Sequence, residues 1–189
     1  MSIISISSGM SVVLTAALIE HCQHLLNSFK TLTGHDLTDR TPSIEIQADN
    51  LFNANFVLVS HDTKPDPIFN YGNQTALDLW EFDWQHFTEL PSRLSAEPLA
   101  RIHRDRLMLE VTNTGYIQNY CGVRISRTGK RFWVKNATVW NVTDGHGNAI
   151  GQAATFSKWS PIRRSQTFSR LSPIRRSHFI RLSRSLEKW

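Results

Sequence analysis

The sequence predicts an α+β fold in which helices cover a five-stranded antiparallel sheet. Three observations predict it: an apolar stripe at helical spacing near the N-terminus, two short β-type runs in the middle, and three longer β-type runs separated by turn signals near the C-terminus. Two strands alone cannot bury one face, so the three later strands are expected to complete the sheet. We expect an apolar cavity between the sheet and its helices.

An amphipathic helix of about five turns is predicted to begin near Val13. Its stripe recurs at three- and four-residue spacing and consists of Leu18, Ile19, Cys22, Leu25, Leu26, Phe29 and Leu32. Thr15 or Ser11 can cap its start, and Gly34 fits a C-terminal stop. Residues 1–12 are expected to be flexible, with Met10 as an alternative start to Met1.

A hairpin is predicted over residues 56–71, after a polar connecting segment at 35–50 that has room for one helical turn. Residues 56–60 and 68–71 are short apolar β-type runs, and the two prolines at 62–67 supply turn chemistry.

Helical pieces are predicted between the hairpin and the last strands. Asn73 is expected to cap a short helix that ends near Trp80, and a second brief helix follows at 84–90. A loop lies between Pro91 and Pro98. Apolar residues at helical spacing then predict a longer helix over 99–113.

Three strands are predicted at 116–126, 132–142 and 149–156. Gly129 and Gly145 lie in the two turn signals between them and are expected to serve structural roles.

The basic character of the chain belongs to its last thirty residues. The whole sequence has a formal net charge of +5. Residues 160–189 hold eight basic residues and one acidic residue. Residues 1–159 therefore carry a net charge of −2, and the predicted domain is residues 13–159 of this part. Within the tail the hexapeptide SPIRRS occurs at 160–165 and again at 172–177. This Ser/Arg-rich composition predicts a disordered basic tail with weak, salt-sensitive anion binding.

The order of elements and four sequence stretches resemble the MEKHLA domain, a PAS-like module that occurs alone in bacterial proteins and at the C-terminus of plant class III homeodomain–leucine zipper factors. The stretches are LLNSF at 25–29 with LTG at 32–34, FNYGNQTAL at 69–77, GKRFW at 129–133 and GQAATF at 151–156. The string that gives the family its name is absent, as are homeodomain and zipper segments. The resemblance, to the stand-alone bacterial type, therefore implies a PAS-like fold with the strand order 2-1-5-4-3. It also implies a sensory or protein-interaction role, without the DNA-binding part.

Neither haem nor flavin is favoured as a cofactor, and the cofactor remains unknown. Flavin photosensors of the PAS class need a reactive cysteine on a short helix in an Asn-Cys-Arg-Phe-Leu-like setting, whereas Cys121 lies in a predicted strand and Cys22 in the first helix. Haem-binding PAS domains use a histidine of the long helix, but the neighbours of His103 are typical of a solvated face.

No metal site or catalytic site is predicted. A helix places Cys22 and His24 about 160° apart, so they do not converge on one ion. Asp144 and His146 lie in a glycine-rich turn, which favours a structural role over an acid–base pair. Four tryptophans are interpreted as core residues in preference to pocket residues: Trp80, Trp84, Trp133 and Trp140.

We therefore predict a non-enzymatic, cytoplasmic sensor or interaction module without a membrane span. Its partner is an unknown protein, a second copy of the chain or a small molecule. The expected cavity lining is Phe56, Leu58, Trp80, Phe87, Met108, Val123, Phe132, Val134 and Phe156, with Asn73 structural. Two alternatives remain open: a ligand-binding protein or enzyme of the nuclear-transport-factor-2-like type, and a nucleic-acid-associated protein that acts through its tail.

Overall fold

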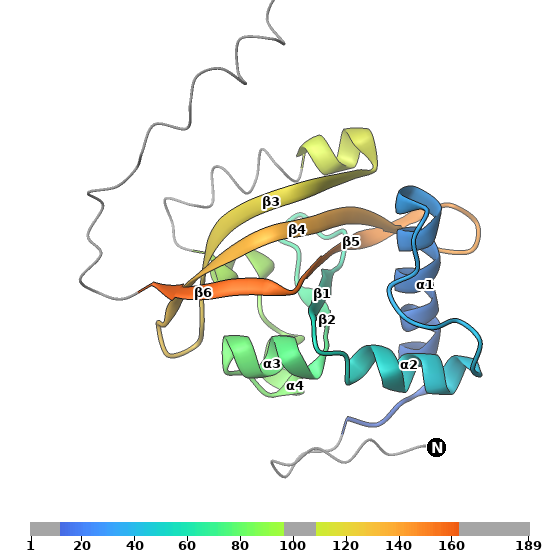
Figure 1. The fold of residues 1–189 in the computed structure, drawn as a ribbon, viewed down its shortest axis with the longest axis horizontal. Coiled ribbons are helices and arrows are strands. Elements are labelled where there is room, and N and C mark those ends of the chain that lie inside the picture. The colour runs from blue at the N-terminus through green and yellow to red at the C-terminus, as the bar shows by residue number, and fades with distance from the viewer. Residues whose placement is uncertain (1–11, 97–108, 163–189) are drawn as a thin grey trace, which may run out of the picture.

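The computed structural model describes residues 12–96 and 109–162, and the elements in these ranges come in groups of helices followed by groups of strands (Figure 1). Met108, most of the helix predicted over 99–113 and most of the predicted tail lie outside the described residues. Residues 109–114 are helical. The other elements are α1 (Ala16–Thr33), α2 (Ile44–Phe52), β1 (Val57–His61), β2 (Phe69–Gly72), α3 (Gln74–Trp80), α4 (Trp84–Phe87), the 3-10 helix η1 (Ser92–Ser95), β3 (Tyr116–Ile125), β4 (Arg131–Thr143), β5 (Ala149–Phe156) and β6 (Lys158–Ile162).

The strands form one antiparallel sheet in the order β2-β1-β5-β4-β3, which confirms the predicted fold class and strand order. The sheet also contains a sixth strand that the sequence analysis missed. β6 pairs with the first half of β4, from Arg131 opposite Ile162 to Lys135 opposite Lys158. The first residues of the predicted tail, 160–162, are therefore part of the sheet.

Pro161 explains why β6 was missed, because proline within a run argues against a central strand. Pro161 lies opposite Phe132, and β6 has a described neighbour only on its β4 side. An edge strand tolerates proline, since one of its sides makes no ladder hydrogen bonds.

Helix α2 is nine residues long and begins within residues 35–50, where a connecting segment with one helical turn was expected. The Oγ of Ser43 accepts a hydrogen bond from the backbone N–H of Ile46 at 3.5 Å, which caps the start of α2. The side chains of Ala48, Leu51 and Phe52 are buried. Polar residues separate these apolar ones, so the short stripe was not recognised.

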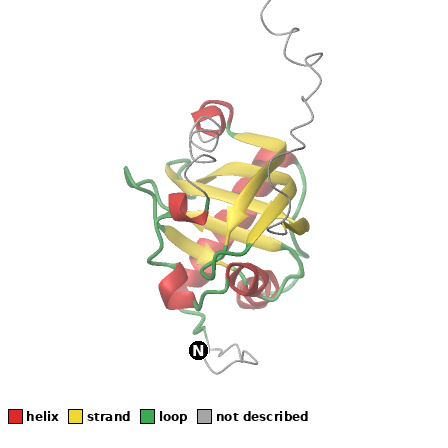
Figure 2. Ribbon diagram, turned by 90° about the vertical axis from the view of Figure 1, so that its left-hand side faces the viewer, coloured by secondary structure: helices red, strands yellow, loops and turns green. Residues whose placement is uncertain are grey.

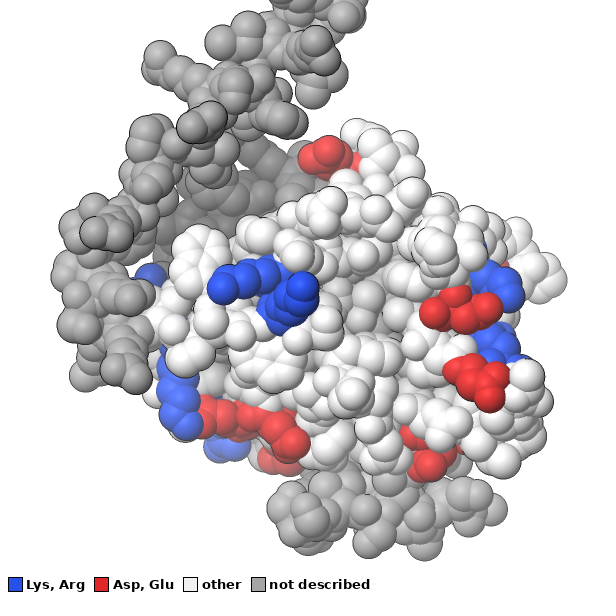
Figure 3. Space-filling view, in the orientation of Figure 1, with Lys and Arg blue, Asp and Glu red and all other residues white. Residues whose placement is uncertain are grey.

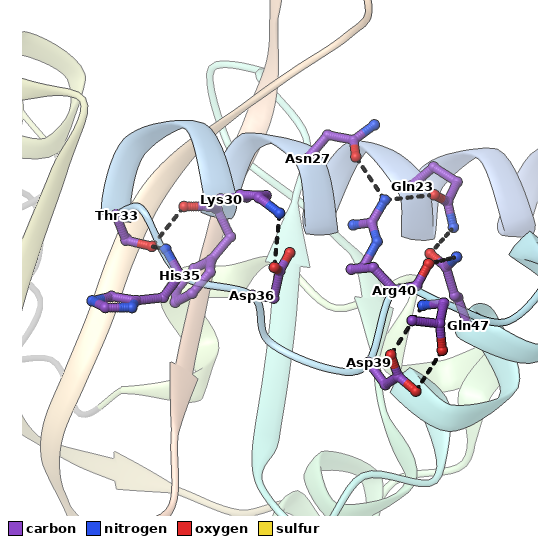
Figure 4. A network of polar contacts seen from close by, with 11 residues as sticks. Gln23, Asn27, Lys30, Thr33, His35, Asp36, Asp39, Arg40 and Gln47 are labelled. Atoms are coloured by element: carbon purple, nitrogen blue, oxygen red, sulfur yellow. Dashed lines mark hydrogen bonds and ion pairs between the residues drawn. The ribbon is translucent and has the colours of Figure 1, made fainter.

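A polar network joins α1 to the segment before α2 (Figure 4). Arg40 donates through Nη2 to the side-chain oxygens of Gln23 at 3.0 Å and Asn27 at 2.8 Å. Gln47 donates to the backbone oxygens of Arg40 and Pro42 at 3.1 and 2.7 Å. These hydrogen bonds therefore fix the connection between the two helices, residues 35–43.

Helices lie on both sides of the sheet (Figures 1 and 2). Residues directly opposite each other in a sheet share a face. Ser60, Ala153 and Trp140 form one such row, and α1 packs on it, with Trp140 Nε1 donating to Ser28 Oγ at 3.1 Å. The side chain of Phe156 points to the opposite face and contacts Trp80 of α3. We call these the α1 face and the α3 face.

The α1 face contains a buried polar chain. His21 Nε2 lies 2.9 Å from Ser60 Oγ, and the Ser60 hydroxyl donates to Asn70 Oδ1 at 2.6 Å. Burial, with a smaller effect of nearby His24, lowers the pKa of His21 to about 4. Cys22 is fully buried in the same interface. Cys22 packs in the apolar stripe as expected, whereas His21 was expected on the solvent-facing side of the helix and instead packs against Ser60 of the sheet.

Asn73 links three elements through one fully buried side chain. Its Oδ1 accepts from the backbone N–H of Leu58 at 2.9 Å and of Ala76 at 3.2 Å, which ties β1 to the start of α3. Its Nδ2 donates to the backbone oxygens of Phe56 at 2.6 Å and Ala54 at 3.4 Å. The predicted cap is present, and it also holds the chain that leads into β1.

Two glycines of the family-like stretches allow close packing. A Cβ atom on Gly72 would lie 2.6 Å from the ring of Phe87, and one on Gly151 would lie 2.0 Å from the backbone oxygen of His61. Both contacts are shorter than a carbon side chain permits, so any larger residue would move α4 or the end of β1.

The side-chain alternation of β4 is reset at Asn136, which has a φ of 53°. Val134 and Ala137 are three residues apart, yet both line the cavity described below. Ser157, between β5 and β6, interrupts the neighbouring strand at the same level. Because both strands are interrupted at this level, the pairing register is the same on both sides of the interruption. Lys135 lies opposite Lys158, and Thr138 lies opposite Thr155.

Glu81 fastens the end of α3 to the β3–β4 turn. Ser126 Oγ donates to its carboxylate at 2.6 Å, and Thr128 and Lys130 also bind it. The hydrogen bond from Lys130, followed by those from Ser126 and Thr128, lowers the pKa of Glu81 to about 2.

Within the described ranges, none of the helices combines the length and the apolar character that crossing a membrane requires.

Replacing Asn73 by alanine is expected to lower the free energy of unfolding by roughly 3 kcal/mol, because it removes a cap and leaves buried backbone groups without partners. Urea unfolding followed by tryptophan fluorescence measures the change. Asn53→Ala, which removes a similar side chain from the exposed end of α2, is the matched control and should cost less than about 1 kcal/mol. Equal losses in the two variants would contradict the linking role of Asn73.

Acidification is expected to destabilise the protein through His21. Its folded-state pKa lies below the unfolded value of 6.5, so its contribution is complete above pH 6.5 and is lost as the pH falls toward 4. The loss amounts to roughly 3 kcal/mol at most, at about 1.4 kcal/mol per pH unit. His21→Gln keeps a donor for Ser60 and should show a weaker decline in urea unfolding between pH 7 and pH 4. An identical decline in both proteins would show that other groups cause it.

Candidate functional site

A cavity of about 70 Å³ lies between the α3 face of the sheet and the segment from α3 to η1. This volume corresponds to about five water-sized positions. The residues that line it are Val59, Ser60, His61, Phe69, Trp80, Ser92, Ser95, Tyr120, Arg124, Val134, Ala137, Val139, Gln152, Ala153, Ala154 and Phe156.

The apolar floor of the cavity follows from strand register. Val59 lies opposite Ala154, and Ala154 lies opposite Val139, so the three side chains form one row across β1, β5 and β4. Alternation along β5 adds Phe156 on the same side. The small side chain of Ala154 in the middle of this row leaves part of the space open.

Trp80 forms the wall of the cavity at the α3 end. Its ring is packed edge-to-face against Phe132 at 5.2 Å and Phe156 at 6.2 Å between centroids, and Phe87 lies behind it at 6.2 Å. Trp80 is only 2% exposed, and its Nε1 has no hydrogen-bond acceptor among the described residues. A buried N–H group without an acceptor is rare in folded proteins and marks a place where a ligand atom or water can bind.

Polar groups reach the cavity from η1 and β3. Ser95 Oγ donates to the backbone oxygen of Ser92 at 2.7 Å, so the two buried serines are held within η1. Arg124 Nη1 donates to the backbone oxygen of Val123 at 3.0 Å, and its guanidinium lies 5.3 Å from the centroid of the Tyr120 ring. Arg124 supplies a positive charge at the cavity.

A hydrogen-bonded group closes the other end of the α3 face. Gln152 Nε2 donates to Asn141 Oδ1 at 3.0 Å and to Thr112 Oγ1 at 3.1 Å. Asn141 Nδ2 donates to the backbone oxygen of Val111 at 3.0 Å. These contacts hold helical residues 109–114 against β4 and β5.

The sequence-predicted lining residues occupy several places. Trp80, Val134 and Phe156 line the cavity. Phe87 and Phe132 are buried behind Trp80, and Phe56, just before β1, is partly buried against the core. Met108 lies outside the described residues.

Leu58 and Val123 point to the α1 face, because their neighbours Val59 and Arg124 face the cavity and side chains alternate along a strand. The run from 56 to 59 is apolar throughout, so the sequence contains no signal that separates the two faces of β1.

The remaining predicted residues are placed at turns or outside the cavity. Gly129 has a φ of 82°, as a turn glycine should, but in the second turn the left-handed residue is Gly147, with a φ of 84°, rather than Gly145. Asp144 Oδ1 accepts from the backbone N–H groups of His146 and Asn148 at 2.8 and 2.9 Å, which is turn chemistry. His103 lies outside the described residues.

The four tryptophans divide between core and surface. Trp80 lines the cavity, Trp140 is buried under α1, and Trp84 packs on Phe52 and Tyr71. Trp133, in contrast, is 41% exposed on the α1 face.

Sequence reasoning missed the polar part of the cavity: Ser92, Ser95, Tyr120 and Arg124. The serines follow Pro91 in a stretch expected to be a loop, and β3 departs from regular alternation near Tyr120. The only sequence signal was a single arginine between Val123 and Ile125 in a β-type run.

Comparison with known proteins gives a family and a fold. The family model for the MEKHLA domain matches residues 19–161. A search of curated proteins found no match.

Among solved structures, a PAS domain from Colwellia psychrerythraea is similar over 63% of this chain and 96% of that one, with 12% identity and a TM-score of 0.54. An RNA-binding light-oxygen-voltage receptor is similar over 65% of this chain and 36% of that one, with 15% identity and a TM-score of 0.52. These likenesses show a PAS-type fold.

The described residues do not present the reactive cysteine of a flavin photosensor at the cavity. Cys22 is buried on the opposite face of the sheet and Cys121 is exposed on β3. The short helix at the cavity, η1, presents Ser92 and Ser95 instead.

Proposed function

Because this chain belongs to the MEKHLA domain family, we propose that it is a sensory or protein-interaction module that binds a small molecule in the cavity of the α3 face. The observation that carries the proposal is the buried Nε1 of Trp80, which has no acceptor among the described residues and belongs to a cavity wall. A sheet floor with one buried, unpartnered donor is typical of a ligand pocket.

The proposal assigns a binding role rather than a catalytic one, in the cytoplasm. Ser60 lies 2.9 Å from His21 and donates a hydrogen bond to Asn70 on the α1 face. A serine engaged in this way serves the interface between α1 and the sheet.

The order of elements favours this proposal over the nuclear-transport-factor-2-like alternative. That cone normally has several long helices before most of its strands, whereas β1 and β2 here follow α1 and the nine-residue α2. The nucleic-acid alternative acts through the tail, most of which lies outside the described residues. The described body adds no support to it on the face drawn in Figure 3, where acidic and basic side chains are interspersed rather than gathered into a basic patch.

We also propose that a protein partner or a second copy of the chain binds to the sheet near Trp133. Its exposed side chain belongs to β4 on the α1 face, beyond the half of β4 on which α1 packs. Large exposed aromatic side chains are enriched at protein interfaces.

Filling the cavity is expected to abolish ligand binding without unfolding the domain. Ala154→Leu adds a side chain of about the size of the open space, at the middle of the cavity floor. Native mass spectrometry and an absorption spectrum of the purified protein should reveal a bound molecule in the wild-type chain and its loss in the variant.

Thr138→Val is the control, since Thr138 lies next to Val139 but points to the α1 face. It should retain the bound molecule. A ligand that remains bound to Ala154→Leu at wild-type occupancy would place the binding site elsewhere and overturn the proposal.

A further inference from the structure

The charge of the cavity points to the chemistry of its ligand, and this inference rests on the proposed function. Arg124 and His61 are the titratable side chains of the lining besides Tyr120, and no carboxylate lines the cavity among the described residues. None of the described ion pairs includes Arg124. The guanidinium is therefore available to an anionic group.

Arg124 and Trp80 lie at the same end of the cavity. Arg124 is directly opposite Phe132 in the β3–β4 register, and Phe132 is the residue against which the Trp80 ring packs at 5.2 Å. Both residues therefore reach the cavity beside Phe132, and the Arg124 guanidinium extends from there toward the Tyr120 ring, 5.3 Å from its centroid. The floor beyond them is apolar, with Val59, Val139 and Ala154.

We propose that the cavity binds a short-chain monocarboxylate, with the carboxylate at Arg124 and Trp80 Nε1 and the alkyl chain on the apolar floor. An ionised carboxylate accepts hydrogen bonds and forms its strongest ones with guanidinium groups. The cavity volume, about five water-sized positions, fits an acid of about five to seven non-hydrogen atoms.

Isothermal titration of the full chain with sodium pentanoate tests the proposal, with pentan-1-ol and pentylammonium as probes of equal chain length. Pentanoate should bind at least tenfold more tightly than either. Arg124→Gln should weaken pentanoate binding at least tenfold, and Trp80→Phe, which keeps the ring but removes the N–H, several-fold. Arg127→Gln is the matched control, because Arg127 lies over Phe82 outside the cavity lining.

The outcomes separate this proposal from the proposed function. Equal binding of pentanoate by wild type and Arg124→Gln, or equal binding of the alcohol and the acid, overturns the carboxylate assignment. If native mass spectrometry reveals a cavity ligand that is not an acid, the assignment fails while the cavity remains the binding site. If no molecule binds the cavity at all, the proposed function fails as well.

Discussion

The buried side chain of Asn73 is the interaction on which the arrangement of the α3 face depends. Four hydrogen bonds join it to the backbone before β1, within β1 and at the start of α3. These bonds orient α3 relative to β1, and α3 carries Trp80, the wall of the cavity. Gly72, the residue before Asn73, lets Phe87 approach. The family-like stretch at 69–77 therefore sets the positions of the helices around the cavity, and the polar groups at the cavity come from other segments.

The two faces of the sheet differ in the kind of contact that they make. Beneath helix α1 the α1 face is closely packed, with Cys22, Leu25 and Trp140 fully buried. His21, Ser60 and Asn70 form a chain of hydrogen bonds there. The α3 face retains open space beside Trp80. The two faces therefore differ in packing: one holds α1 on the sheet, and the other leaves a cavity.

Sequence patterns predicted the elements whose signals are local, and missed those that depend on contacts elsewhere. The stripe of α1, the cap at Asn73 and the positions of the turns were readable, because periodicity and turn chemistry act within a few residues. The strand order followed from the resemblance to the family. The continuous apolar run of β1 hid which face Leu58 and Val59 take. Arg124 was not recognised as a cavity residue, since one charged residue in a strand is usually solvent-facing. β6 was missed because Pro161 is acceptable only at an edge, and the position of an edge is a property of the whole sheet.

The simultaneous break at Asn136 and Ser157 has an evolutionary consequence. On one side of the break β4 pairs with β5, and on the other side it pairs with β6. The pairing register is the same on both sides. A residue gained or lost on one strand at this level would shift every side chain on one side of the break to the wrong face. The two strands must therefore change length together, so we expect related sequences to vary at these two positions as a coupled pair.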